Sequence, residues 1–261
     1  MRILITNDDG ITAPGLEVAE AIAVEIAGDG GEIWVVAPAF EQSGVSHCVS
    51  YIRPMRIEHL AERRYAVEGS PADCVLAGLN EILAKSPPDL VLSGVNRGHN
   101  VAEDTLYSGT VGGAMEGALH GIPSVALSQY HAPGAAASAD TFAPARAHGA
   151  GVIRRLLAHG VWTGERYDVF YNVNFPALDP GAVRGLRATV QGHRDAPTFG
   201  VAPQTAPNGR SFLWLTHGRG NAHTAPGTDS RDCHDGYITV TPLTADLTAH
   251  GLVAPLAGAL A

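Results

Sequence analysis

Short apolar runs alternate with longer stretches of helical character along the first half of the chain. Apolar runs of strand length occupy residues 2–6, 32–38, 89–94 and 122–128. Between them, the pattern predicts two helices with an apolar stripe and one built of small residues, at 15–27, 70–83 and 110–121. Because neighbouring parallel strands are joined by helical crossovers, this order predicts βαβ units around a mostly parallel sheet.

The pattern becomes less regular after residue 129. A linker of small residues, "HAPGAAASAD", precedes an expected helix near 140–158 and an expected strand at 168–176. Shorter β-like segments follow between loops rich in Gly, Pro and Asn, at 183–191, 211–216 and 236–241. The final "GLVAPLAGALA" is interpreted as either a weak helix or a frayed tail. This half is therefore expected to be an α+β extension, with an arm or hairpin that packs on another subunit.

Composition favours a folded, acidic protein without a nucleic-acid partner. The chain has 261 residues, 45% of them hydrophobic and 16% charged, which suits one large α/β domain or two small ones. The formal net charge of −9 argues against a nucleic-acid backbone as the main partner, although a local site can still bind a small phosphorylated ligand. No apolar run approaches the roughly 20 residues of a transmembrane helix, and the N-terminus lacks a signal-peptide pattern. We therefore expect a cytoplasmic protein without a membrane partner.

The cysteines, histidines and single lysine of the chain argue against several kinds of metal, disulfide and lysine-based sites. Cys48, Cys74 and Cys233 are widely spaced and odd in number, so buried free thiols are expected rather than disulfides or a thiolate zinc site. The histidine-containing segment "THGRGNAH" is interpreted as a loop rather than a metal site. Lys85 is the only lysine and does not belong to a phosphate-binding P-loop, which excludes a P-loop NTPase and a Schiff-base enzyme.

Acidic and polar residues follow three of the expected strands. Asp8 and Asp9 come directly after the first strand, Ser43 follows the second, and Asn96 follows the strand at 89–94. Ligands of parallel α/β sheets bind at the carboxyl ends of the strands. Carboxylate, hydroxyl and amide oxygens suit Mg²⁺, Mn²⁺ or Ca²⁺, whereas a solvated turn is the alternative for the two aspartates alone. Both carboxylates can approach one ion only if the strand breaks between them or just after them, which Gly10 permits.

The segment "YSGTVGG" joins a loop to the helix expected at 110–121. Free backbone N–H groups and hydroxyls at such a helix start form a site for an anion, phosphate above all. Ordinary capping of the helix by Ser108 or Thr110 is the alternative, and Arg97 either pairs with a phosphate or remains a surface charge. A cation site beside an anion site indicates hydrolysis of a phosphate ester.

Seven segments, in order along the chain, resemble the signatures of one family. They are "ILITNDDGITAPG", "VVAPAFEQSG", "GSPADC", "SGVNRGHN", "YSGTVGGAMEG", "YNVNFP" and "GTDSRDCHDGYITVTPLTADLTAH". Together they cover nearly the whole chain, to about residue 250, and they resemble the SurE family of stationary-phase survival proteins. Members of that family are metal-dependent 5′/3′-nucleotidases, so the resemblance implies a cytoplasmic phosphatase that acts on nucleoside monophosphates.

The resemblance also implies a domain organisation. Residues 1–130 are expected to form a Rossmann-like core that carries the metal and phosphate site. Residues 131–261 are expected to supply the remaining core elements and an oligomerisation extension, within one structural domain overall. A homodimer or homotetramer is implied.

Site residues follow from the resemblance motif by motif. The family's divalent-metal ligands fall on Asp8, Asp9, Ser43 and Asn96, with one Mg²⁺ or Mn²⁺ ion per subunit. One of the two aspartates is expected to orient or deprotonate the attacking water, so both are candidate catalytic residues. A covalent aspartyl-phosphate route is disfavoured, because its usual signature is Asp-x-Asp and here the two aspartates are adjacent.

The phosphate contacts of the family fall on Asn96, Ser108, Gly109 and Thr110. The chain departs from the family pattern at His99, where a proline is expected, and its similarity is loose between residues 192 and 226. The first departure bears on substrate preference and the second on the oligomerisation arm. Two other functions remain alternatives: a non-catalytic sensor of a phosphorylated metabolite in the same pocket, and a nucleotide-sugar glycosyltransferase.

Overall fold

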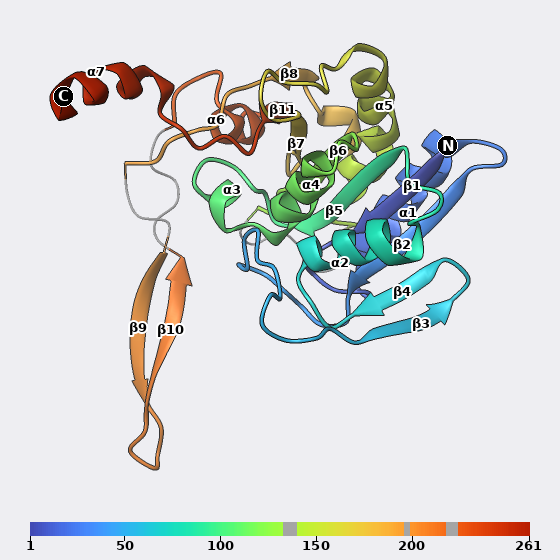
Figure 1. Ribbon diagram of the computed structural model, residues 1–261, viewed down its shortest axis with the longest axis horizontal. Helices are drawn as coiled ribbons and strands as arrows, with labels where there is room; N and C mark the ends of the chain where they lie inside the picture. Colours follow the sequence, from blue (N-terminus) through green and yellow to red (C-terminus); the bar gives the residue numbers. More distant parts are fainter. Residues whose placement is uncertain (133–139, 196–198, 218–223) are drawn as a thin grey trace.

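A nine-stranded sheet forms the centre of the computed structural model, which describes residues 1–132, 140–195, 199–217 and 224–261 (Figure 1). Its strand order is β3–β4–β2–β1–β5–β6–β7–β11–β8. The bounds of these strands are β1 Arg2–Thr6, β2 Glu32–Pro38, β3 Ile57–Ala61, β4 Arg64–Val67, β5 Leu90–Arg97, β6 Ser124–Gln129, β7 Phe170–Phe175, β8 Leu186–Ala188 and β11 Ile238–Leu243. A separate hairpin consists of β9 Phe199–Thr205 and β10 Ser211–His217.

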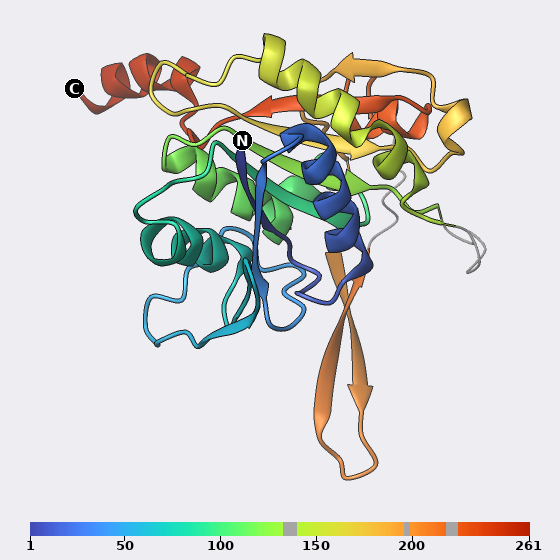
Figure 2. The same ribbon diagram turned by 90° about the vertical axis from the view of Figure 1, so that its right-hand side faces the viewer.

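The helices lie mostly on the two faces of this sheet (Figure 2). Their bounds are α1 Pro14–Ala27, α2 Pro71–Ala77, α3 Asp104–Tyr107, α4 Gly109–Leu119, α5 Ala143–His159, α6 Asp229–His234 and α7 His250–Leu260. The helix expected at 70–83 begins with the predicted capping box of Ser70 and Asp73, but it continues beyond Ala77 as the π-helical turn η1, Gly78–Ile82. A short 3-10 turn, η2, spans Pro180–Ala182.

The sheet has the topology that places ligand sites at a switch point. Strand β1 pairs in parallel with β2 on one side and with β5 on the other, and the chain then continues outward in both directions through β4 and through β6 and β7. Among the described strand pairs of this sheet, β3–β4 and β7–β11 are antiparallel and the others are parallel. The predicted Rossmann-like, mostly parallel α/β fold is therefore confirmed, and the loops after β1 and β5 leave its centre in different directions.

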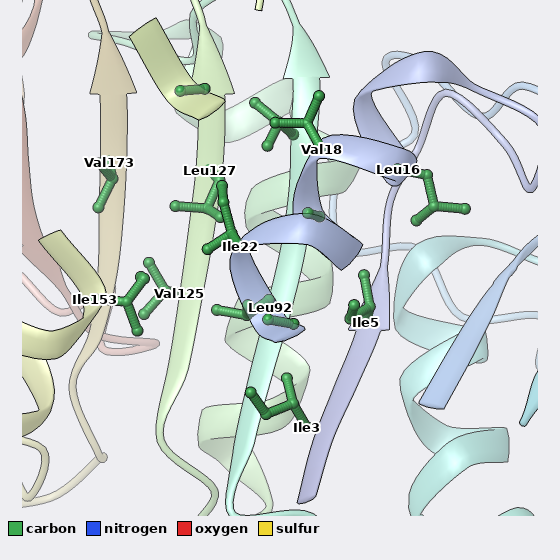
Figure 3. Packing of buried hydrophobic residues seen from close by; sticks show 14 of the residues in the cluster. Ile3, Ile5, Leu16, Val18, Ile22, Leu92, Val125, Leu127, Ile153 and Val173 are labelled. Atoms are coloured by element: carbon green, nitrogen blue, oxygen red, sulfur yellow. The ribbon is translucent and has the colours of Figure 1, made fainter. Parts of the chain in front are cut away.

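The core is divided by the sheet into two sides. On one side, alternate residues of the central strands, such as Ile3 and Ile5, pack against α1 and α5 (Figure 3). Leu4, whose side chain points to the opposite face, packs with residues of α2. This alternation explains why the strands read as continuous apolar runs in the sequence, because both faces are covered.

Helix α4 packs closely against the sheet, which explains its glycines. A Cβ atom at Gly117 would lie 2.3 Å from the hydroxyl oxygen of Ser124 in β6, and one at Gly113 would lie 2.9 Å from that of Ser93 in β5. Such distances are shorter than van der Waals contact, so glycine is required for this approach. The small-residue pattern at 110–121 is therefore a helix, as predicted, with its bounds at Gly109–Leu119.

The hairpin β9–β10 and helix α7 project away from the sheet (Figures 1 and 2). Both carry exposed large apolar side chains. These are Val201, Phe212, Leu213, Trp214 and Leu215 in the hairpin, and Leu252, Val253, Leu256 and Leu260 in α7. The final segment thus takes the helical of its two predicted forms.

Several features differ from the sequence-based expectations, three of which bear on the predictions above. Cys48 is exposed, whereas Cys74 and Cys233 are buried as predicted, because the loop that carries Cys48 crosses the surface. The segment "THGRGNAH" is not entirely a loop, since Thr216 and His217 lie in β10 and pair with residues of β9. Residues 218–223 of this segment lie outside the described ranges. The hairpin β3–β4 was not predicted, because its exposed β3 lacks an apolar alternation.

The sequence predicts that the chain has no transmembrane helix. Within the described ranges, every helix falls short of the length and apolar character that a membrane span requires. Location in the cytoplasm stays a prediction.

Candidate active site

Backbone hydrogen bonds join the loops that follow β1, β2 and β5. The backbone N–H of Gln42 donates to the carbonyl of Asp8 at 2.7 Å, and that of Ile11 donates to the carbonyl of Pro38 at 2.8 Å. From the last residue of β5, the backbone N–H of Arg97 donates to Oδ2 of Asp9 at 3.0 Å. The polar residues at these strand ends are therefore held together by the main chain.

A tight turn after β1 sets the position of the two aspartates. Gly10 has φ +98°, in the region that favours glycine, and its carbonyl accepts a hydrogen bond of 2.9 Å from the side-chain amide of Asn7. Strand β1 ends at Thr6, so the chain breaks from the sheet before Asp8, as the sequence predicts.

Asp8 is fixed from the start of α4. The hydroxyl of Thr110 donates to Oδ1 of Asp8 at 2.6 Å, and the backbone N–H of Thr110 donates to Oδ2 at 3.1 Å. The partial positive charge of the helix N-terminus further favours a carboxylate at this place. Each carboxylate oxygen retains a lone pair for another ligand, since an ionised carboxylate offers about four acceptor positions.

The environment of the two aspartates disfavours their negative charge. Asp8 is only 3% exposed, and burial raises its pKa to about 6, with a smaller contribution from the nearby charge of Asp9. Burial also raises the pKa of Asp9, against the opposing effect of its hydrogen bond from Arg97. Among the described residues, no Lys, Arg or His forms an ion pair with either carboxylate. Among the described residues Asp8 therefore has no positive ion-pair partner, whereas the nearby charge of Arg97 partly offsets that of Asp9.

A cavity of about 370 Å³ opens beside Asp8. Its polar lining comes from the three strand-end loops and the start of α4, and includes Asp8, Ser43, Asn96, Arg97 and Ser108. Four of the predicted site residues thus meet in one cavity at the switch point of the sheet. Its volume falls within the range of small-molecule sites, about 300–1,000 Å³.

Asp9 does not line this cavity. It lies in a neighbouring cavity of about 270 Å³, with Glu41 and Thr12, at the start of α1. Arg97 lines both cavities. Asp8 and Asp9 are adjacent in the chain, and their side chains point in different directions, which places them in different cavities.

The remaining predicted residues have defined partners. The hydroxyl of Ser43 donates to Glu41 at 3.0 Å, and the side-chain nitrogen of Asn96 donates to the carbonyl of Gly98 at 3.0 Å. Ser108 is the N-cap of α4, where its hydroxyl accepts a hydrogen bond of 3.1 Å from the backbone N–H of Val111. Ser108 therefore performs the capping role considered above and also lines the cavity.

Gly109 and Thr110 lie behind the cavity wall. A Cβ atom at Gly109 would come within 2.9 Å of Cβ of Asp8, so glycine is needed for the approach of α4 to this aspartate. Thr110 uses both its hydroxyl and its backbone N–H for Asp8. The hydroxyl and the backbone N–H of Thr110, which belong to the predicted phosphate turn, therefore bind the carboxylate of Asp8 in this structure.

Aromatic rings complete the cavity, and sequence reasoning did not select most of them. They are His99, Tyr107, Tyr130, His131 and Phe199. His99 drew attention only as a departure from the family pattern, and Tyr107 precedes the motif residue Ser108. Phe199 stands at the beginning of β9, far from the other motifs in sequence, so no local signal indicated it.

The donors at the site fit a hard divalent cation. Two carboxylates, a hydroxyl and an amide oxygen are the ligand types that Mg²⁺ and Mn²⁺ prefer. A buried carboxylate without a positive partner gains most from such a cation, and the side-chain oxygen of Asn96 accepts no hydrogen bond from the described residues. A site built from three or more His, Cys, Asp or Glu side chains is absent from the described ranges, so the expected ligand set is the mixed one.

Fold and site together define a doubly wound α/β protein with an acidic ligand site at the carboxyl ends of its parallel strands. The family model described as "Survival protein SurE" matches residues 3–198. The chain therefore belongs to the SurE family, and the predicted resemblance is confirmed.

Several relatives match over nearly their full length. The 5′-nucleotidase SurE of Cereibacter sphaeroides strain KD131 is 59% identical over 256 residues, which cover 98% of each chain. The protein of the same name from Roseobacter denitrificans is 57% identical, and the match covers 99% of each chain. Among solved structures, the SurE protein from Aquifex aeolicus has 34% sequence identity and a TM-score of 0.81, with 100% of both chains covered.

Proposed function

We propose that this protein hydrolyses nucleoside monophosphates to a nucleoside and inorganic phosphate in a divalent-metal-dependent reaction. One observation carries the proposal: Asp8, Ser43, Asn96 and Ser108 line one cavity in a chain that is 59% identical to a protein named 5′-nucleotidase. Both 5′ and 3′ esters are included as substrates. No observation favours the sensor or the glycosyltransferase.

We infer that one Mg²⁺ or Mn²⁺ ion per subunit is held by Asp8, Asp9, Ser43 and Asn96. When bound, such an ion supplies Lewis-acid polarisation of a phosphoryl oxygen. The cavity beside Asp8, the burial of Asp8 without a positive partner among the described residues and the hard-oxygen donor set support this assignment. Asp9 lines the neighbouring cavity, so its part in this assignment is tested separately from that of Asp8.

The chain's own residues supply positioning and proton transfer. Thr110 fixes the orientation of Asp8 through two hydrogen bonds, which keeps the carboxylate pointed in one direction. Asp8 or Asp9 orients the attacking water and accepts its proton as the water oxygen bonds to phosphorus. The bond from phosphorus to the nucleoside oxygen breaks, and that oxygen takes up a proton.

Phosphate binding is assigned to the same edge of the cavity. Asn96, Ser108, Gly109 and Thr110 are the proposed phosphate contacts, and Ser108 and Asn96 line the cavity directly. Arg97 also lines this cavity, and its positive charge, which acts on Asp9 as well, favours an anion there.

We further propose that the protein is a homodimer or homotetramer in which the β9–β10 hairpin contacts another subunit. Its exposed apolar residues and its position away from the sheet support this role. The division into a core at 1–130 and an extension at 131–261 remains a proposal as well. The sheet continues across that boundary, since β6 pairs with β7.

A phosphate-release assay tests the proposed activity. Purified protein is incubated with AMP, GMP and 3′-AMP, each with Mg²⁺, with Mn²⁺ and with EDTA. The proposal requires release of phosphate from the nucleotides with at least one metal and its loss with EDTA. A sensor would bind AMP in equilibrium dialysis without releasing phosphate, and that result would contradict the proposal.

A further inference from the structure

Helix α4 supports two loops that carry proposed metal ligands. It holds Asp8 directly through Thr110, whose hydroxyl and backbone N–H both donate to that carboxylate. The second loop follows β2 and carries Ser43, which lines the same cavity as Asp8. The separation of these two ligands therefore depends on how the loop after β2 is attached to α4.

The part of this loop at 43–50 lies directly on α4. A Cβ atom at Gly112 would come within 2.6 Å of the carbonyl oxygen of Ser46 and within 3.0 Å of Cα of His47. Both distances are shorter than van der Waals contact, so glycine is required for the approach of the loop to the helix. Glu116 lies one turn further along the same face of α4.

Glu116 is a buried carboxylate between two histidine rings. Its side chain is 8% exposed, with Oε2 at 2.5 Å from Nε2 of His47 and Oε1 at 3.1 Å from Nε2 of His120. Because a carboxylate accepts hydrogen bonds, each ring directs an N–H toward it. His120 is the C-cap residue of α4 itself, whereas His47 belongs to the loop. Only the bond from His47 therefore attaches the loop to the helix.

The backbone of the loop needs such attachment. Gly44 has φ +78° and Ser46 has φ +58°. The second value is disfavoured for a residue with a Cβ atom, so it persists only where surrounding contacts maintain it. The backbone N–H of Ser46 donates to the carbonyl of Tyr107 at 2.9 Å, and its hydroxyl donates to that of Leu106 at 2.7 Å. These bonds reach α3, and the next residue, His47, supplies the side-chain bond to α4.

We propose that His47 and Glu116 are positioning residues that hold Ser43 where it binds the same divalent cation as Asp8. The inference rests on the proposed function, because it concerns the metal site assigned there. Both residues act through the backbone between His47 and Ser43, since neither is among the described residues that line the cavity. Once an ion is bound, its own contacts hold Ser43. Loss of the pair should therefore weaken metal binding and leave kcat at saturating metal unchanged.

Substitution of His47 tests this role. The measurement is the Kd of Mn²⁺ for the full chain without substrate, by isothermal titration calorimetry. His47→Leu should bind Mn²⁺ about ten-fold more weakly than wild type, the lower end of the loss that follows removal of a group supporting a metal ligand. His47→Gln keeps an N–H donor for Glu116 and should retain the wild-type Kd. At saturating Mn²⁺, both variants should hydrolyse AMP with the wild-type kcat.

His120→Leu is the matched control. His120 donates to the other oxygen of the same carboxylate, and its side chain is 34% exposed against 29% for His47. Because His120 does not belong to the loop, His120→Leu should bind Mn²⁺ with the wild-type Kd. Melting temperatures without metal show which variants are folded. A merely structural role for His47 would lower the melting temperature of His47→Leu and leave its Kd for Mn²⁺ unchanged.

The partner residue provides a second variant. Glu116→Gln replaces one accepting oxygen by an NH₂ group and should also weaken Mn²⁺ binding. His47→Leu combined with Glu116→Gln should lose no more affinity than His47→Leu alone, because both changes remove the same contact. Losses that add in the double variant would contradict the pairing. If His47→Leu is unfolded at the assay temperature, Glu116→Gln carries the comparison with His120→Leu.

The outcomes separate this inference from the proposed reaction. An equal Kd for Mn²⁺ in folded His47→Leu and wild type would overturn the inference, and so would an equal loss of affinity in His120→Leu. If wild type binds no Mn²⁺, the inference and the metal assignment both fail. If the Kd values follow the expected order but no phosphate is released from AMP, the inference holds and only the proposed hydrolysis fails.

Discussion

Thr110 binds both carboxylate oxygens of Asp8, with its hydroxyl 2.6 Å from Oδ1 and its backbone nitrogen 3.1 Å from Oδ2. These contacts cross 102 residues of sequence and attach the start of α4 to the end of β1. They orient a buried carboxylate, and they also use two donors that the sequence assigns to phosphate. The relationship leads directly to a prediction for Thr110.

Replacement of Thr110 by valine should reduce catalysis while keeping the volume of the side chain. The change removes the hydroxyl donor to Asp8, and a hydrogen bond to a charged group is worth about 1.5–3 kcal/mol, so kcat/KM for AMP should fall about ten-fold to hundred-fold. Thr110→Ser keeps the hydroxyl and should remain near wild type. Steady-state phosphate release with saturating Mn²⁺ measures both variants. Wild-type kcat/KM in Thr110→Val would mean that the hydroxyl does not orient Asp8 for the reaction.

Removal of either aspartate charge should abolish metal-dependent activity without unfolding the protein. In Asp8→Asn and Asp9→Asn, most phosphate release should disappear. Without metal, the melting temperature should stay equal to that of wild type or rise, because a buried charge and its repulsion are removed. At 100 times its Kd, Mn²⁺ should stabilise wild type by about 2.7 kcal/mol and so raise its melting temperature. It should not raise the melting temperature of Asp8→Asn.

The control for these variants is Asp29→Asn, since Asp29 lies exposed in the loop after α1. It should behave like wild type in both the activity and the melting measurements. If Asp9→Asn kept wild-type turnover and wild-type stabilisation by the metal while Asp8→Asn lost both, Asp9 would not be a metal ligand. The metal assignment would then be restricted to the residues around Asp8.

His99 should make stability depend on pH. Burial lowers its pKa from 6.5 to about 4, so the unfolded state takes up a proton near pH 6.5 while the folded state does so near pH 4. The stabilising contribution is fully present above pH 6.5 and is lost as the pH falls to about 4. The contribution involved is at most about 3.4 kcal/mol, because the pKa values 6.5 and about 4 differ by about 2.5 units at 1.36 kcal/mol each.

The measurement is urea unfolding of wild type and His99→Phe at intervals between pH 7.5 and pH 4. Phenylalanine keeps a flat ring on Tyr130 but does not titrate, so its free energy of unfolding should fall less than that of wild type over this range. Parallel curves for the two proteins would show that His99 has an ordinary pKa in the folded state.

The β9–β10 hairpin should control oligomeric state. Leu213 and Leu215 are exposed on the same side of β10, so Leu213→Glu with Leu215→Glu places two charges on that surface. Size-exclusion chromatography with light scattering should then show a smaller particle than wild type. Arg210→Glu, at the tip of the hairpin, is the matched charge-changing control and should keep the wild-type mass. An unchanged mass in the double variant would exclude this surface from the subunit interface.

Local patterns predicted the fold because they follow from backbone geometry. The apolar runs at β1, β2, β5 and β6 are buried on both faces, and the helices between them show an apolar or small-residue face, so each element could be recognised alone. The hairpin β3–β4 could not, since its strand β3 is exposed along its whole length and lacks this pattern.

The candidate site, like the fold, could be predicted from local sequence patterns only in part. Local sequence patterns sufficed to assign Asp8, Ser43, Asn96 and Ser108 to strand ends and a helix start, and parallel topology brings such positions to one edge of the sheet. Three contacts could be learned from the folded chain alone: Asp9 faces a separate cavity, Thr110 binds Asp8, and Phe199 packs on Tyr107. Side-chain direction after a strand break and contacts across a hundred residues depend on how the loops pack, and no local periodicity records that packing.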